Sequence, residues 1–358
     1  MLFIMARVFD LEKQKKEIDD WLAKGTSSSN LNVLLGAGCS QPAISGLGVT
    51  EEEIDAVMKN DESLKAEQLT YKFLSSIIEV NLKLISETKD DTIENTRKTY
   101  SSFLSCLQNL LRKRKTSLHF NLINIFTTNY DLFIEDAASR LPDLFLNDGF
   151  CRNTNLQNKF YFSPPEFFHY RGHADYLYDY KTDLPIFNLI KLHGSLSWKL
   201  EQGSNSRIFF NNELPEALTT EQQNDESLLR KYNHACTVIL PSMQKHQTSV
   251  ITDVYYDLIR LFSYELERPN SLFLAMGFSF RDEHLCKVIS RGLSNPSLLF
   301  LSFAYCKEDA DYLENKFRDF NNFIIVCTSE KDEKDQAKKL DFQKIINNCF
   351  TKFVLEDK

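Results

Sequence analysis

Short apolar runs recur along the chain, and most of them end in a turn that contains glycine or polar residues. The first run, residues 31–35, leads directly into Gly36-Ala37-Gly38. Apolar runs of this length without polar alternation are typical of strands that are buried on both faces of a parallel sheet. Runs of the same kind predict further strands at residues 122–126, 187–192, 237–240, 272–276, 298–303 and 323–327.

Helical spacing of apolar positions separates several of these runs. It predicts an opening helix over residues 10–24 and later helices over residues 253–267 and 309–317. Residues 51–118 are charged and carry apolar positions three and four apart, which predicts an inserted layer of two to four helices. Because buried strands alternate with helices, we expect an α/β fold with a doubly wound, mostly parallel Rossmann-like sheet.

Two stretches do not follow this alternation. Residues 143–186 are rich in Phe, Tyr, Asn and Pro, and residues 201–233 are polar. We interpret both as irregular insertions that form a small subdomain or cover a site. The expected organisation is an N-terminal helix within residues 1–30, a main domain over 31–330 and a C-terminal helical tail over 331–358.

Composition narrows the class of protein. A chain of 358 residues buries roughly three-quarters of its unfolded surface, and 42% hydrophobic with 26% charged residues is ordinary for a globular protein. The net charge of -8 argues against nucleic-acid binding, and we interpret the basic residues 112–115 as a solvated helix end. The sequence contains neither a signal peptide nor an apolar run of about 20 residues, so we expect a cytoplasmic protein without a membrane span.

Eight cysteines are dispersed along the chain, and none of them forms a Cys-x-x-Cys pair. This spacing favours neither a structural zinc site nor a disulfide framework. We expect most of the thiols to be small core residues.

The first candidate motif is Gly36-Ala37-Gly38-Cys39-Ser40, which follows a predicted strand. Glycines at such a turn allow the backbone to approach a pyrophosphate. A plain turn from strand to loop is the alternative interpretation. An ordinary dehydrogenase is disfavoured, because the third glycine of Gly-x-Gly-x-x-Gly and an acidic residue about 20 positions later are missing.

The second motif is Thr127-Thr128-Asn129-Tyr130-Asp131. Polar side chains at the carboxyl end of a buried strand lie where open α/β sheets bind ligands. The Asn129 amide can donate to and accept from a ribose hydroxyl or a water. The alternative is that Asn129 or, better placed, Asp131 caps a helix that begins near Leu132.

The third motif, Lys191-Leu192-His193-Gly194, also ends a predicted strand. A histidine in such a turn can act as a general base near neutral pH. We interpret the other histidines as structural: His119, His169, His173, His234, His246 and His284. In the fourth motif, Gly277-Phe278-Ser279, the glycine permits close approach of a ligand and Ser279 can hydrogen-bond to phosphate or ribose.

In this order, the four motifs resemble those of the sirtuin superfamily: its phosphate-and-ribose loop, its Thr-Gln-Asn-x-Asp segment, its catalytic His-Gly and its Gly-Thr/Tyr-Ser turn. The resemblance implies a Rossmann-like domain that binds NAD. It assigns catalysis to Asn129 and His193. It assigns NAD binding to Gly36, Ala37, Gly38, Ser40, Thr128, Asp131, Gly277 and Ser279.

The departures from that family are informative. Protein-deacylating sirtuins carry two Cys-x-x-Cys pairs after the His-Gly motif, whereas residues 195–237 contain Cys236 alone. Residues 45–50 replace the usual Gly-Ile-Pro-Asp-Phe-Arg segment, so no nicotinamide contacts are transferred to them. In these respects the chain resembles the zinc-free NAD-consuming effectors of bacterial antiphage defence. That resemblance implies hydrolysis of NAD to nicotinamide and ADP-ribose, without zinc.

Two other functions stay open. One is an NAD-dependent protein deacylase, and the other is a non-catalytic subunit that binds NAD or ADP-ribose and uses residues 51–118 as an assembly surface. A nuclease is disfavoured, because no carboxylate cluster suits paired metal ions. A free NADase would be toxic, so we expect a homo-oligomer whose partner, by resemblance, is a hexameric DNA-translocating ATPase of the HerA-like class.

Overall fold

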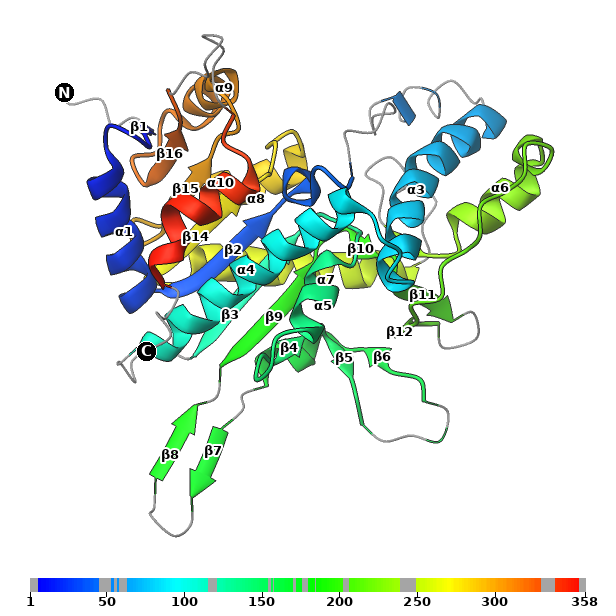
Figure 1. Cartoon of the computed structure of the whole chain (residues 1–358), viewed down its shortest axis with the longest axis horizontal. Helices are drawn as coiled ribbons and strands as arrows, with labels where there is room; N and C mark the ends of the chain where they lie inside the picture. The colour runs from blue at the N-terminus through cyan, green and yellow to red at the C-terminus, as the bar shows by residue number, and fades with distance from the viewer. Residues whose placement is uncertain are drawn as a thin grey trace.

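The computed structural model describes residues 6–44, 53–54, 57, 63–114, 121–153, 156, 158–169, 172–175, 180–183, 185–201, 206–238, 249–329 and 339–353. Its centre is an eight-stranded sheet in which neighbouring strands pair in parallel throughout (Figure 1). In spatial order the strands are β1 (Arg7–Asp10), β16 (Phe323–Cys327), β15 (Leu299–Phe303), β14 (Ser271–Met276), β2 (Asn30–Leu35), β3 (Leu122–Thr127), β9 (Ile186–Lys191) and β4 (Leu146–Asn147). The doubly wound α/β fold is confirmed.

The direction in which the sheet grows reverses between β2 and β14. From β2 the chain continues through β3 to β9 on one side, and β14, β15 and β16 follow on the other side. In open α/β sheets, ligands bind outside the carboxyl ends of the strands at such a reversal. The strand order alone therefore predicts that a ligand would bind at the loops after β14, β2 and β3.

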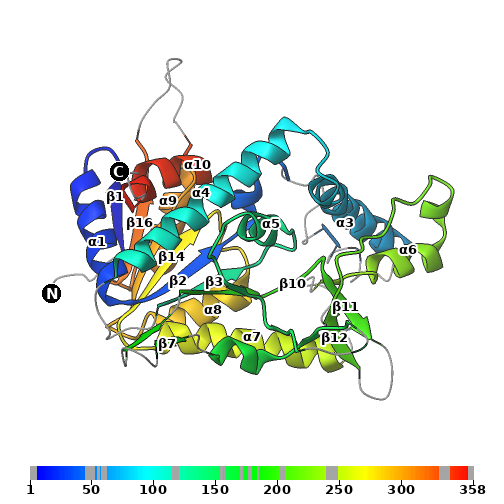
Figure 2. The same ribbon diagram turned by 60° about the horizontal axis from the view of Figure 1, so that its bottom comes forward.

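Helices cover both faces of the sheet and bury two separate apolar cores (Figure 2). One core lies under α1 (Lys15–Ser28), α4 (Asp91–Lys113), α5 (Phe133–Ser139) and α10 (Phe342–Ile345). The other lies under α7 (Ser249–Glu267), α8 (Glu283–Gly292) and α9 (Lys307–Phe317). Because both faces are covered, the strands read as continuous apolar runs, and this is why their positions were predictable.

One row of side chains crosses the sheet on the α7 face. Phe323, Phe300 and Phe273 are register partners on β16, β15 and β14, and their rings stack at 5.2 and 5.6 Å between centroids. The row continues as an asparagine ladder, formed by Asn32, Asn124, Asn188 and Asn147 at the same register of β2, β3, β9 and β4.

Each amide of the asparagine ladder bonds to the next one. Nδ2 of Asn124 donates to Oδ1 of Asn32 at 2.9 Å, Asn188 donates to Asn124 at 3.0 Å, and Asn147 donates to Asn188 at 3.0 Å. A slip of one residue in any strand would leave buried amides unpaired, which costs about 1–3 kcal/mol for each group. The ladder therefore fixes the register of the strands that carry the second and third motifs.

The described part of residues 51–118 consists mainly of α3 (Ser63–Ile85) and α4. Helix α3 packs against α6 (Glu226–Asn233), and the two helices form a lobe beside the carboxyl edge of the sheet (Figure 1). Tyr71 and Tyr232 meet edge to face at 4.8 Å between ring centroids, and Nδ2 of Asn233 donates to Glu67 at 2.7 Å. Helix α4 instead lies on the sheet, which brings one of its tyrosines to the site described below.

The two stretches that break the alternation meet in a small antiparallel sheet of order β11-β12-β6-β5. Its strands are β5 (Phe150–Cys151), β6 (Tyr161–Phe162), β11 (Trp198–Glu201) and β12 (Arg207–Phe210). A hairpin of β7 (Gly172–Asp175) and β8 (Tyr180–Asp183) extends away from the body (Figure 1). The remaining short elements are η1 (Ala37–Ser40), η2 (Pro164–Phe168), η3 (Gln222–Asn224), η5 (Ile346–Phe350) and η6 (Thr351–Phe353).

Some sequence-based boundaries were wrong. Residues 7–10 form β1, an edge strand that pairs with β16, so the opening helix begins at Lys15 rather than at residue 10. The strand expected at residues 237–240 is not part of the large sheet. Its described part is β13 (Thr237–Val238), which pairs antiparallel with β10 (Gly194–Ser195). Residues 45–50, 239–242 and 330–338 lie outside the described part of the chain.

Candidate functional site

The four sequence motifs lie at one edge of the large sheet. They follow the last residues of β2, β3, β9 and β14, which are four adjacent strands in the order β14-β2-β3-β9. Parallel strands end at the same edge, so loops that are as much as 240 residues apart in sequence come together there. This edge contains all ten residues singled out from the sequence.

Three glycines allow the first and fourth motifs to touch. A Cβ on Gly36 would lie 2.5 Å from the carbonyl oxygen of Gly277, and a Cβ on Gly277, where φ is +61°, would lie 2.5 Å from the Cys39 nitrogen. A Cβ on Gly38 would lie 2.9 Å from the Gly277 Cα, and the Gly38 N–H donates to the Gly277 carbonyl at 3.0 Å. Side chains at these positions would separate the two loops.

This contact gives the glycine turn a structural reason in addition to the expected approach to a pyrophosphate. The N–H of Gly36 donates to the Met276 carbonyl at 3.0 Å, and the N–H of Gly38 is also bonded within the loops. Both amides are therefore bonded within the protein, and the expected contact of this turn with a pyrophosphate stays a prediction. Ala37, between them, is the exposed member of the turn.

The Asn129 side chain is buried and turns back toward the first motif. Its Nδ2 donates to the Gly36 carbonyl and to Ser40 Oγ, each at 3.1 Å, and lies 3.5 Å from the Tyr100 hydroxyl. Since the Gly36 carbonyl can only accept, the amide nitrogen must face it. Oδ1 of Asn129 is left buried without a hydrogen-bond partner among the described residues. An unpaired buried acceptor costs about 1–3 kcal/mol, so this atom is suited to a donor supplied by a ligand.

Ser40 and Tyr100 complete the cluster around Asn129. Ser40 Oγ donates to Asp131 Oδ2 at 2.7 Å and lies 3.0 Å from the Tyr100 hydroxyl. Tyr100 comes from α4, and it had not been singled out from the sequence, because nothing near it in the sequence marks it. Burial, and then the charge of Asp131, raise the pKa of Tyr100, so it stays a neutral hydroxyl.

Asp131 bonds both to the first motif and to the turn before α5, whose N-cap residue is Leu132. Its Oδ2 accepts from Ser40, whereas its Oδ1 accepts from the Phe133 N–H at 3.3 Å, in the turn before α5. Burial raises the pKa of this carboxyl, and the nearby charge of Lys191 opposes that rise. Asn129 caps no helix, since its side chain points to the first motif.

Lys191, the last residue of β9, joins the second and third motifs. Its buried ammonium donates to the Asp131 carbonyl at 2.5 Å and to Ser195 Oγ at 3.0 Å, and it pairs with Glu135 at 2.7 Å. Burial raises the pKa of Glu135, and Lys191 again opposes the rise. A single cation thus holds the loop that carries Asn129 against the strand that carries His193.

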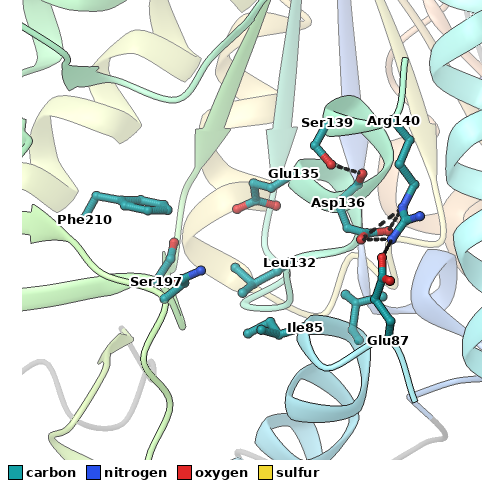
Figure 3. A pocket seen from close by; sticks show the side chains of 11 residues that line it. Ile85, Glu87, Leu132, Glu135, Asp136, Ser139, Arg140, Ser197 and Phe210 are labelled. Carbon is teal, nitrogen blue, oxygen red and sulfur yellow. Dashed lines mark hydrogen bonds and ion pairs between the residues drawn. The ribbon is translucent and has the colours of Figure 1, made fainter. Parts of the chain in front are cut away.

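Glu135 also lines a cavity of about 290 Å³ beside α5 (Figure 3). Its wall includes Leu132, Ser197 and Phe210, together with an ion pair between Arg140 and Asp136 at 3.1 Å. None of the ten residues singled out from the sequence lines this cavity. The cavity is therefore separate from the edge where the four motifs meet.

His193 is buried and pairs with a residue that had not been singled out. Its Nε2 lies 3.1 Å from Oδ2 of Asp282, six residues after the end of β14. Burial alone would raise the pKa of Asp282, but the hydrogen bond and charge of His193, together with the backbone N–H groups of Leu285 and His284, lower that pKa. Gly194 must follow His193, because its φ is +79° and a Cβ would lie 2.3 Å from the Thr237 carbonyl.

The remaining candidates have less defined roles. Thr128 is half-buried, and its N–H donates to the Leu35 carbonyl at 3.2 Å. Ser279 is exposed beyond Gly277. Within the described ranges, no group of three or more His, Cys, Asp or Glu side chains is arranged to hold a metal ion. No helix in that part of the chain is long and apolar enough to cross a membrane.

An open parallel sheet with polar turns at its reversal point defines a Rossmann-like, nucleotide-binding class of protein. Within that class, a family model described as the SIR2-like domain matches residues 123–325, which is more than half of the chain. The chain belongs to this SIR2-like family, and the family fits an NAD-related function. No curated protein matches the sequence.

Proposed function

We propose that this protein is an NAD glycohydrolase that cleaves the nicotinamide–ribose bond of NAD to give nicotinamide and ADP-ribose. The observation that carries the proposal is the buried, unpaired Oδ1 of Asn129, at the same sheet edge as the His193 imidazole. The family supports NAD as the ligand. An acceptor and a base at one edge are the two groups that a hydrolytic cleavage needs from the protein.

In this proposal the two residues have different roles. Asn129 accepts a hydrogen bond from a ribose hydroxyl or from the attacking water, and His193 accepts a proton from one of them. Cleavage of an N-glycosidic bond passes through a state in which the ribose carries positive charge, so the ribose must be held and a nucleophile admitted. We propose that the rest of NAD approaches along Ala37 and Ser279, which are exposed.

Water is the proposed nucleophile rather than an acyl-lysine. Residues 195–237 contain one cysteine, which is fewer thiolates than a four-cysteine zinc module needs. Cys236 is buried, and Lys199 donates to its sulfur at 3.2 Å. We therefore propose a zinc-free enzyme, and we take the deacylase as the alternative within the same family.

We further propose that the enzyme is an NAD-depleting effector of antiphage defence, located in the cytoplasm. Such an activity must be held off until it is triggered, so a homo-oligomer and a HerA-like hexameric DNA-translocating ATPase are the proposed controls. A non-catalytic NAD- or ADP-ribose-binding subunit is the rival function. The unpaired Asn129 acceptor favours catalysis in this proposal, because it lies at the same sheet edge as the His193 imidazole.

The test is incubation of the purified chain with NAD, with and without the proposed ATPase, followed by chromatographic quantification of nicotinamide and ADP-ribose. Asn129→Ala and His193→Ala should each lower the rate by about 10²-fold or more, since general-base catalysis contributes about 10²–10⁴-fold. The matched controls, Asn315→Ala and His169→Ala, change exposed residues and should leave the rate unchanged.

Three outcomes would contradict parts of the proposal. Full activity of Asn129→Ala would remove the assignment of that residue. Nicotinamide release that requires an acylated peptide, mole for mole, would establish the deacylase instead. Full activity of the isolated chain as a monomer would refute the proposed control by assembly.

A further inference from the structure

The contact between His193 and Asp282 spans the point where the sheet reverses. His193 follows β9 and Asp282 follows β14, and the ends of β2 and β3 lie between these two strands. The pair thus links the segments that follow the two outer strands of these four. Asp282 lies outside the four motifs, and the proposed function assigns roles to Asn129 and His193 but none to Asp282.

The position of Asp282 is fixed independently of His193. Its Oδ1 caps α8 by accepting from the Leu285 N–H at 3.0 Å, so only Oδ2 is directed at the imidazole. The side chain is 15% exposed and that of His193 is 8% exposed, so solvent competes little for their hydrogen bond.

The turn that precedes Asp282 is held as well. Phe280 is fully buried with φ at +56°, a left-handed conformation that residues with a Cβ rarely adopt. Its carbonyl accepts from Lys316 Nζ at 2.8 Å and from the Tyr312 hydroxyl at 3.2 Å, which keeps it in that conformation. Strained backbone that surrounding contacts hold in place is typical of functional loops.

We propose that Asp282 is a positioning residue that holds the proton of neutral His193 on Nε2 and thereby makes Nδ1 the nitrogen that accepts a proton during NAD cleavage. A carboxylate that accepts from one ring nitrogen fixes the tautomer and orients the ring. The inference rests on the proposed function for the reaction, whereas the tautomer is a property of the free protein.

The proton balance of the step is simple. The oxygen of water bonds to C1′ of the ribose, its proton moves to Nδ1 of His193, and the bond from C1′ to nicotinamide breaks. Nicotinamide leaves as a neutral molecule with the electron pair of that bond. Asp282 stays ionised beside the imidazolium and stabilises it, and His193 then returns the proton to solvent.

The variant Asp282→Asn tests the contact with His193 while the helix cap, and with it the fold, is kept. Asparagine keeps an acceptor for the Leu285 N–H and is itself a good helix cap, but it places an NH₂ or a neutral oxygen against Nε2. We expect kcat to fall by about 10²-fold, while KM for NAD and the urea midpoint of unfolding stay near wild type. The matched control is Asp225→Asn, which makes the same change at the cap of α6, in the lobe, and should leave kcat unchanged.

The tautomer is read by ¹H–¹⁵N NMR of the free protein labelled on its seven histidines, with His193→Gln identifying the signal. Wild type should show the proton on Nε2, and Asp282→Asn should shift the signal toward the Nδ1–H form. An Nδ1–H tautomer in wild type, unchanged kcat in Asp282→Asn, or a loss of stability that accounts for its loss of activity would each overturn the inference. Wild-type inactivity toward NAD would instead contradict the proposed function, and the NMR measurement would still decide the tautomer.

Discussion

Replacing Lys191 by methionine tests whether one buried cation holds the site together. Methionine keeps most of the aliphatic stem but removes three contacts of the ammonium, with the Asp131 carbonyl, Ser195 Oγ and Glu135. The Lys191 side chain is 3% exposed, so water does not replace these contacts. Breaking a buried ion pair from one side costs about 3–5 kcal/mol. Since Glu135 is partly exposed, we expect a loss near 3 kcal/mol in the free energy of unfolding.

The loss should depend on pH in a defined direction. Burial raises the pKa of Asp131 and Glu135, and Lys191 opposes both rises, so its removal raises the two values further. A carboxyl whose pKa is higher in the folded than in the unfolded protein favours folding at low pH. That contribution disappears as the pH rises from the unfolded value, about 4, through the folded pKa. The destabilisation by Lys191→Met should therefore be largest at pH 8 and smaller at pH 5.

Urea unfolding followed by fluorescence of the two tryptophans measures both effects. Lys83→Met is the control, because Lys83 pairs with Glu79 on the surface of α3 and its loss should cost at most about 1 kcal/mol. Adding Glu135→Gln to Lys191→Met removes one stranded charge and should restore part of the stability at pH 8. A loss below about 1 kcal/mol, or one that does not shrink at pH 5, would refute the reasoning.

Three further substitutions test other parts of the fold and site. Asn124→Ala leaves two members of the asparagine ladder without their partner. It should lower the free energy of unfolding, measured in urea, by about 2–4 kcal/mol. The control Asn315→Ala changes an exposed residue and should alter that free energy by less than about 0.5 kcal/mol. Gly277→Ala places a Cβ at φ +61° against the Cys39 nitrogen, so the melting temperature should fall. NAD binding, measured by calorimetry, should weaken at least tenfold. Unchanged NAD binding would contradict the role given to the loop contact. Tyr100→Phe removes a hydroxyl near Ser40 and Asn129 and should lower the free energy of unfolding by about 1 kcal/mol. It should also lower kcat/KM for NAD. Wild-type kinetics in this variant would show that the hydroxyl is dispensable.

The large sheet was predictable because both of its faces are covered. Strands without a solvent face lack polar alternation, so β2, β3, β9, β14, β15 and β16 appear in the sequence as separate apolar runs. Edge strand β1 escaped prediction, since Arg7–Asp10 contains two charged residues among four. The small antiparallel sheet also escaped, because its strands are short and their partners lie in two distant segments.

The asparagine ladder is visible in the sequence as a repeated Asn position, from which the strand order and register could have been predicted. Asn32, Asn124 and Asn188 each occupy the third position of a strand whose interior is otherwise apolar. One buried amide is a cost in a strand, but three at the same strand position can satisfy one another across a sheet. A repeated polar residue at one position of successive apolar runs therefore predicts both the adjacency of those strands and their register.

The site was predictable only as far as residues that directly follow strands. Asn129 and His193 each come two residues after the ends of β3 and β9, so the fold alone brings them to one edge. Tyr100 and Asp282 reach the same edge from α4 and from a turn six residues beyond β14. Their sequence positions carry no periodicity that points to the edge, because tertiary packing and the strained turn at Phe280 decide where they lie.

A glycine motif can be recognised in the sequence although one reason why its residues must be glycine differs from that expected. Gly36 and Gly38 were attributed to a pyrophosphate, yet their close contacts and amide hydrogens are used against the loop after β14. The glycines are needed whether or not a ligand is present, since they join the two sides of the sheet reversal. What points to a ligand is the Asn129 amide, whose nitrogen is satisfied by Gly36 and Ser40 and whose oxygen is not. A buried acceptor without a donor costs free energy in the free protein, and the proposed function supplies that donor with the substrate.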